Sequence, residues 1–287
     1  MADELKRQDI DKLRKAVELL EQSTITATIT KLIGTPLEKG VKALPDSISN
    51  RIGDLVQVAL TKAADAALWT LNNNPGEEAS TKSNKLFAAV SGAVGGAFGF
   101  TALAIELPIS TTNMMRAVAD IARSEGFNLE DTETKAHCIS VFAFGGPSPD
   151  DDGVDTSYYA SRSFIAKTMG NVATDLAAIA AKNAADSSAK HAVNAFSSKE
   201  ASSFIAKIIE AIAVKFNVTI TPKIAAQIAP GVGAITGATI NTMFTDYYQD
   251  IARGHFIILN LEKAYGAELI KIEYSRLASE KKGLRLK

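Results

Sequence analysis

The sequence predicts an all-α fold, a multi-helix bundle around two buried helices that are rich in glycine and alanine. Apolar residues recur at helical spacing along most of the chain, and glycine and proline mark the breaks. No run of alternating strands and helices occurs, which argues against a parallel sheet. Two segments, residues 86–105 and 224–245, carry no charge, and each leads into the same four residues, Asp-Ile-Ala-Arg.

Composition narrows the class of protein. With 287 residues, of which 46% are hydrophobic, the chain is long enough to bury a large core. The net charge of −1 argues against nucleic-acid binding, because neutralising phosphates needs a clear basic excess. Cys138 is the one cysteine, so no intramolecular disulfide forms, and the charged N-terminus lacks the apolar region of a secretory signal. These features predict a cytoplasmic protein.

The first half of the chain is divided by short polar breaks. Residues 2–22 form an amphipathic pattern that predicts a helix. Residues 23–33 alternate threonine with apolar side chains, which is strand-like by itself, but a lone strand has no partner, so we expect helix or irregular structure. Asp46 and Ser47 are good N-caps for a helix over residues 46–73, which ends at an Asn-Pro-Gly stretch.

After the first uncharged segment, proline and glycine set the expected boundaries. Pro108 suits the first turn of a new helix that runs to about Ser124 and stops at Gly126. The next helix begins near Asp131 and ends at a glycine pair, and residues 145–155 form a loop. Helices are then expected over 156–184, over 198–217 up to the proline-broken VTITP stretch, and over 246–278 with a break near Gly266, before a basic tail.

Glycines four residues apart recur in both uncharged segments. Each glycine costs about 1 kcal/mol against alanine inside a helix, so several on one face indicate close approach by a neighbouring helix. Both segments reach the roughly 20 residues of a membrane span, but their small side chains drive insertion weakly. A buried pair, a conditional or peripheral membrane role and a membrane span all stay open. The packing glycines are Gly92, Gly96, Gly99, Gly233 and Gly237.

Four stretches carry a resemblance to a known family. They are ELPISTTNMMRAVADIARSEG (106–126), CISVFAFGG (138–146), the pair Tyr158-Tyr159 with Arg162, and PGVGAITGATIN (230–241). Together they are similar to the EcsC protein family over most of residues 50–266, and residues 1–45 and the basic tail fall outside the match. The family takes its name from a gene beside an ABC transporter in Bacillus, so the resemblance implies a link to membrane transport and implies no particular chemistry.

One polar line marks the helix expected after Pro108. Thr112, Arg116 and Asp120 follow at steps of four, with Arg123 three beyond, on a helix that is otherwise apolar. With Glu106, they are candidates to line a cleft for an anionic headgroup or a small ligand. Ordinary surface pairs worth a few tenths of a kcal/mol are the alternative. In a third interpretation, Asp120 and Arg123 pair with their counterparts in the second quartet, Asp250 and Arg253. Tyr158 and Arg162 complete the candidate ligand-binding set.

Other chemistries find little support. His137 and Cys138 are neighbours that point about 100° apart on a helix, so they form no catalytic dyad, and His191 and His255 are lone. The acidic loop at 148–153 fails as a calcium loop at both ends, and Gly231-Val-Gly233 to Gly237 is not a dinucleotide fingerprint. We expect neither a metal nor a cofactor. The basic tail is a candidate contact for anionic lipid.

Three hypotheses for function follow. The first is a non-enzymatic cytoplasmic protein that acts at or near the inner face of the membrane, with anionic lipid or a transport system as partner. The second is a helical enzyme or small-molecule binder that uses the polar line, with catalytic residues unidentified. The third is a protein-interaction module; homo-oligomer formation is left open. The expected division is an N-terminal extension (1–45), an EcsC-like domain (46–278) and a tail (279–287).

Overall fold

The structure, a computed structural model, describes residues 5–33, 46–68, 71, 74–80, 99–144, 157–186, 198–228 and 233–285. Over these residues it contains helices and no strand, which confirms the all-α prediction. The helices are α1 (Arg7–Leu20), α2 (Ile25–Ile33), α4 (Asp46–Leu68), α6 (Gly99–Ser124), α7 (Thr132–Ser140), α8 (Ser157–Asp186), α9 (Ser198–Ile228), α10 (Gly233–Tyr265) and α11 (Ala267–Arg285), with the 3-10 turn η1 (Val141–Ala143) after α7.

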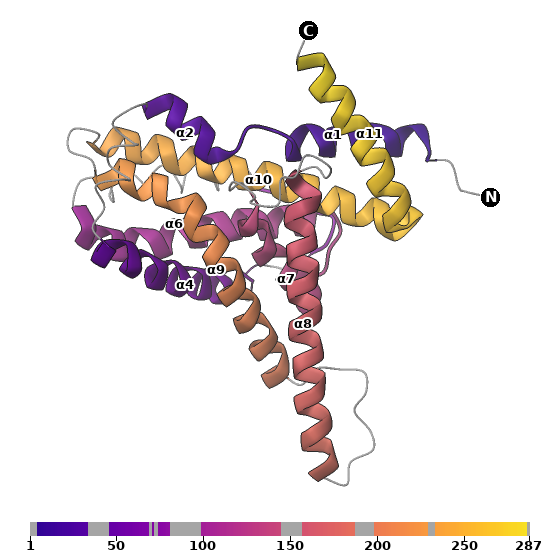
Figure 1. Cartoon of the computed structure of the whole chain (residues 1–287), viewed down its shortest axis with the longest axis horizontal. Coiled ribbons are helices and arrows are strands. Elements are labelled where there is room, and N and C mark those ends of the chain that lie inside the picture. The colour runs from indigo at the N-terminus through magenta and orange to yellow at the C-terminus, as the bar shows by residue number, and fades with distance from the viewer. Residues whose placement is uncertain are drawn as a thin grey trace.

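Helices α6 and α10 lie side by side and run in the same direction. Asn241 of α10 donates to Glu106 of α6, and Asn260 donates to the backbone carbonyl of Glu125, so both contacts join residues 135 positions apart. Helix α4 packs along α6, and α9 packs against α4, α6 and α10. Helix α8 and the first half of α9 project away from this body, and α1 and α11 meet at one end of α10 (Figure 1).

Two prolines lie inside helices, although the sequence predicts a helix boundary at or near each of them. Pro108 is within α6, which already begins at Gly99, so the expected helix start at Pro108 is wrong. Pro222 is within α9, which continues to Ile228, so the expected end at 217 is also wrong. A proline inside a helix costs about 3 kcal/mol through one lost hydrogen bond and a clash. Packing of α6 and α9 against their neighbours outweighs that cost.

The last helices also differ from their expected limits. Residues 233–265 form one continuous helix, α10. It includes both the end of the second uncharged segment and the start of the C-terminal helix that we expected to begin at residue 246. The predicted break at Gly266 is confirmed, because its φ of +87° is a left-handed conformation that favours glycine. The tail is helical as far as Arg285, since α11 includes it.

The end of α6 is confirmed in detail. Gly126 has φ +90°, and its N–H donates to the carbonyl of Arg123 at 3.0 Å. The N–H of Phe127 donates to the carbonyl of Ala122, also at 3.0 Å. These two bonds form a Schellman motif, in which the last helical carbonyls are satisfied by a left-handed glycine and the residue after it. Residues 25–33, strand-like in sequence, are helical as α2.

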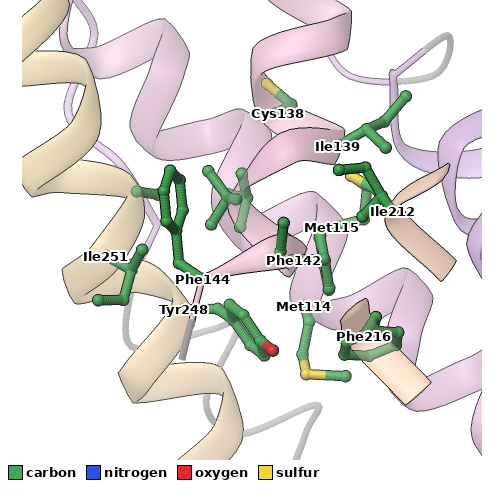
Figure 2. Packing of buried hydrophobic residues seen from close by; sticks show 14 of the residues in the cluster. Met114, Met115, Cys138, Ile139, Phe142, Phe144, Ile212, Phe216, Tyr248 and Ile251 are labelled. Carbon is green, nitrogen blue, oxygen red and sulfur yellow. The ribbon is translucent and has the colours of Figure 1, made fainter. Parts of the chain in front are cut away.

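One cluster of buried side chains forms the core, and Figure 2 shows the part of it where α6, α7, η1, α9 and α10 meet. Phe142 of η1 stacks on Tyr248 of α10 with ring centroids 4.8 Å apart, and it meets Phe216 of α9 edge-on at 5.0 Å. Helix α1 joins the same cluster along α10. There, an ideal Cβ on Gly254 would lie 2.6 Å from Cγ of Leu20, so this position requires glycine.

Several predictions fall outside the described residues. They concern the glycines of the first uncharged segment, the acidic loop and the lone histidine of the polar stretch: Gly92, Gly96, residues 145–155 and His191. Gly99 and Gly233 are the first residues of α6 and α10, and Gly237 lies one turn into α10. Close packing at these glycines therefore stays a prediction, as does the division of the chain at residues 45 and 278.

Candidate functional site

Glu106, the first residue of the candidate set, is buried where α6, α9 and α10 meet. Lys223 of α9 donates to Oε1 of Glu106 at 3.1 Å and to the hydroxyl of Ser110 at 2.8 Å. Asn241 of α10 donates to the same carboxylate oxygen at 2.9 Å. The side chain of Lys223 is 0% exposed and that of Glu106 is 3% exposed, so the two charges face each other without contact to bulk water.

The pair is held in its charged form by mutual attraction. Burial by itself would raise the pKa of Glu106, but the ammonium of Lys223 and the hydrogen bond from Asn241 outweigh it, so the pKa lies below its usual value. Burial lowers the pKa of Lys223, and the carboxylate of Glu106 opposes this shift. The 3.1 Å contact with the carboxylate of Glu106 favours the ammonium form of Lys223 over the free amine.

Thr245 extends this cluster along α10. It lies one turn beyond Asn241. Because the contacts between α6 and α10 join residues 135 positions apart in the chain, Thr245 is at the level of Ser110 on α6. We name the set Glu106, Ser110, Lys223, Asn241 and Thr245 the polar seam. Oε2 of Glu106, Oδ1 of Asn241 and the hydroxyl of Thr245 are buried without a hydrogen-bond partner in the described part of the chain. Buried polar atoms are normally paired, so this group is unusual.

Asp120 and Arg123 lie elsewhere, at the C-terminal end of α6. Arg123 donates to Oδ1 of Asp120 at 2.8 Å and to Oε2 of Glu77 at 2.9 Å. It also donates to the carbonyls of Asn74 and Glu78, at 3.0 and 3.1 Å. Asp120 accepts the N–H of Ser80. We name this cluster the Arg123 clamp, because it holds residues 74–80 against the end of α6.

The predicted polar line is therefore divided between several places. The hydroxyl of Thr112 donates to the carbonyl of Pro108 at 2.7 Å, within its own helix. Arg116 is half-buried on α6. The structure does not bring Glu106 to the Arg123 clamp, since their hydrogen-bond partners belong to different helices and segments. Of the two repeated quartets, Asp120 pairs with Arg123 within α6, while Arg253 pairs with Glu125 at 3.0 Å.

Tyr158 and Arg162, from the start of α8, join a third group on α10. Both terminal nitrogens of Arg162 bind the carboxylate of Glu262, and the hydroxyl of Tyr159 donates to the same group at 3.3 Å. Tyr158 bonds to Nδ1 of His255 at 2.9 Å. Burial raises the pKa values of Tyr158 and Tyr159, so both phenols are neutral near pH 7.

His255 is not lone, which corrects the sequence interpretation. Its Nε2 lies 3.2 Å from Nδ1 of His137, so His137, His255 and Tyr158 form one hydrogen-bonded chain across α7, α10 and α8. Burial, together with the nearby His137 and Arg162, lowers the pKa of His255 well below its usual value. The imidazole therefore stays neutral, and the chain links three helices without a buried positive charge.

Nucleophile and metal chemistry have no support in the described residues. Burial raises the pKa of the Cys138 thiol, which belongs to the apolar core (Figure 2). A thiol with a raised pKa is a poor nucleophile. Across the ranges that the structure describes, no three side chains of the metal-binding types lie close enough to hold an ion.

The sequence contained one signal for the polar seam that residue spacing within α6 did not reveal. Glu106 directly follows the first uncharged segment, and Lys223 directly precedes the second. When two apolar segments pack together, the charged residues at their borders can pair with few groups except each other. The His137–His255–Tyr158 chain left no such signal, because its members are 97 and 118 positions apart.

Comparison with known families decides the affiliation of the chain. The model of the EcsC protein family matches residues 2–258. The chain belongs to the EcsC protein family. The match begins near the N-terminus, so it includes α1 and α2, which the quoted motifs left out, and it contains the whole polar seam. Searches among curated proteins and among solved structures give no significant match.

Proposed function

We propose that this EcsC protein binds a small molecule in the polar seam between α6, α9 and α10. The observation that carries the proposal is the fully buried Lys223, which satisfies one oxygen of Glu106 while the second oxygen has no partner among the described residues. A buried acceptor without a hydrogen bond costs about 1–3 kcal/mol, and more when it is charged. A ligand that bonds to it recovers this energy.

Binding fits the seam better than catalysis does. Nζ of Lys223 donates to Glu106 at 3.1 Å, and an amine held as an ammonium by a carboxylate is not a nucleophile. Glu106 has a lowered pKa, whereas a carboxyl group that acts as a base near pH 7 needs a raised one. The contacts of the seam thus favour recognition of a molecule over its transformation.

Native mass spectrometry of protein purified from its host tests the proposal. We expect the wild type to carry an added mass that the double variant Glu106→Gln, Lys223→Met lacks. Removing both charges together avoids an unpaired buried ion, so this variant keeps its fold. The control is Arg276→Met, Glu280→Gln, which removes an exposed pair on α11 and retains the added mass. Equal masses for wild type and seam variant would contradict the proposal.

Membrane association is a second candidate, supported by apolar side chains on the surface. Ile105 and Ile109, one turn apart on α6, are 67% and 46% exposed, and Val214 and Val218 form a similar pair on α9. Exposed apolar groups of this size favour contact with lipid or protein. In the described ranges, every helix is too short or too polar to cross a bilayer. The proposed role is therefore contact with the membrane surface.

Liposome flotation distinguishes this second candidate. Folded wild-type protein should float with vesicles that contain anionic lipid, and the variant Ile105→Ser, Ile109→Ser should float less. Ile272→Ser, an exposed residue of α11, is the matched control and should behave as wild type. If folded wild-type protein stays at the bottom of the gradient at low salt, the membrane role is excluded, whatever the polar seam binds.

A further inference from the structure

The unused hydrogen-bonding groups of the polar seam describe the ligand that would satisfy them. Oε2 of Glu106 and Oδ1 of Asn241 are acceptors, and the hydroxyl of Thr245 can both donate and accept. The nitrogen donor groups of the seam each have a partner already, since Lys223 donates to Glu106 and to Ser110, and the amide of Asn241 donates to Glu106. A ligand therefore has to supply hydrogen-bond donors.

The charge of the seam limits the ligand further. Glu106 and Lys223 balance each other, and both are shielded from bulk water. An added ion would be a buried charge without a counter-ion, and such a charge costs several kcal/mol. An anion would in addition face the free oxygen of Glu106. This argues against the anionic headgroup that the sequence suggested as ligand for Glu106, and it favours a molecule without net charge.

Hydroxyl groups meet both requirements. They are uncharged, they donate to carboxylate and amide oxygens, and they also accept from a threonine hydroxyl. Next to Thr245, the buried ring of Phe244 has its centroid 5.9 Å from Nζ of Lys223, so an aromatic face borders the seam. The carbon skeleton of a hydroxylated molecule can pack on such a face while its hydroxyls reach the oxygens.

We propose that the ligand of the polar seam is an uncharged polyol, recognised by Oε2 of Glu106, Oδ1 of Asn241 and the hydroxyl of Thr245. This inference rests on the proposed binding function and adds the chemical class. The recognised feature is a set of neighbouring hydroxyls, which a free polyol and a hydroxylated lipid headgroup share.

The first test compares ligand classes by isothermal titration calorimetry on the purified full chain. The uncharged probes are glycerol and myo-inositol, the cationic probe is putrescine, and the anionic probes are phosphate and malonate. We expect saturable heat with at least one polyol and none with the ions. Vesicles with and without monogalactosyldiacylglycerol, a lipid with an uncharged hydroxylated headgroup, then distinguish a free polyol from a headgroup, because only the headgroup would bring the protein to the vesicles.

The second test uses Thr245→Val, which removes one hydroxyl and keeps the shape of the side chain. Without ligand, this variant should melt at a higher temperature than wild type, because a buried hydroxyl without a partner is lost. Polyol affinity should fall about tenfold, the effect of one hydrogen bond worth about 1.4 kcal/mol. Thr112→Val is the control, since that hydroxyl bonds within α6, and it should leave polyol affinity unchanged.

The outcomes separate the two levels of the proposal. Saturable binding of putrescine or an anion that Thr245→Val weakens would overturn the polyol class and retain the binding function. A lower melting temperature for Thr245→Val, together with no heat from any probe and no added mass in native mass spectrometry, would overturn both. A polyol effect that is equal in wild type and Thr245→Val is general solute stabilisation and also overturns the assignment of this residue.

Discussion

Two buried cations of this protein, Arg123 and Lys223, are held in different ways. Arg123 donates to two carboxylates and two backbone carbonyls, all between 2.8 and 3.1 Å. Lys223 donates to one carboxylate and one hydroxyl, and the carboxylate of Glu106 keeps an oxygen without a partner in the described residues. Both cations are shielded from water, so burial by itself does not distinguish them.

The difference lies in how completely each cluster is satisfied. The guanidinium of Arg123 offers a rigid set of donors that matches the fixed acceptors of residues 74–80, which is what a structural clamp needs. The point charge of Lys223 leaves acceptors for another molecule. Completeness of hydrogen bonding, rather than burial or charge, therefore distinguishes the Arg123 clamp from the polar seam, and for this reason we propose only the seam as a binding site.

The largest effect is expected from breaking the seam pair on one side only. Lys223→Met leaves Glu106 as a buried charge without its cation, and loss of one partner of a buried pair costs about 3–5 kcal/mol. Urea unfolding should therefore give a much lower free energy for this variant. Adding Glu106→Gln to it should restore most of the loss. If the double variant is as unstable as the single one, the two side chains are not coupled.

A smaller effect is expected at the Arg123 clamp from Arg123→Lys, which keeps the positive charge and removes the planar, forked set of guanidinium donors. A lysine cannot reach four acceptors in two directions, so we expect a loss of about 2 kcal/mol, the worth of one or two charge-assisted hydrogen bonds. Limited proteolysis should then cut within residues 74–80 faster than in wild type. Unchanged stability would show that the fork geometry is dispensable and would weaken the comparison with Lys223.

The third prediction concerns a buried base that stays uncharged. Because the pKa of His255 is lowered in the folded state, the unfolded chain binds more protons below the ordinary histidine pKa of about 6.5. Its contribution to stability is thus complete above about pH 6.5 and is lost as the pH falls below that value, by up to about 1.4 kcal/mol per pH unit. Urea unfolding between pH 5 and 7 measures this slope.

The matched variant is His255→Gln, which should have a flatter profile than wild type over the same pH range. The two proteins differ only at this side chain, so the difference between the two profiles measures the contribution of His255 together with its bond to His137. Parallel profiles would mean that His255 is protonated in the folded protein, contrary to its burial among His137, Tyr158 and Arg162.

The smallest effect is expected at an exposed cation. Arg276 of α11 lies between Glu273 and Glu280 on the surface, with half of its side chain exposed. Surface pairs of this kind contribute little because water screens them. Arg276→Met should leave the urea midpoint unchanged within error, which provides the baseline for the two buried cations. A clear loss would mean that charge pairing stabilises this protein irrespective of burial.

The sequence predicts the helical class and the helix ends at Gly126 and Gly266, because these depend on local periodicity and on glycine conformation. It places helix boundaries wrongly at the two prolines, where packing against other helices outweighs a local cost. For the site, the motif indicates Glu106, and Lys223 becomes a candidate once the two uncharged segments are expected to pack together, whereas His255 requires knowledge of which helices meet. Such contacts join residues about a hundred positions apart, and helical periodicity contains no information about them.

The docking of α1 has a consequence for how the chain is made. Asp9 accepts from Tyr265, and backbone carbonyls of Glu18 and Glu21 accept from Lys281, so α1 finds its partners at separations of 256 to 263 residues. At a synthesis rate of about 5–20 residues per second, α1 emerges roughly 10 to 50 seconds before them. During that interval its apolar face is uncovered on the ribosome, and a chain that stops before α11 leaves the contacts of Lys281 unmade.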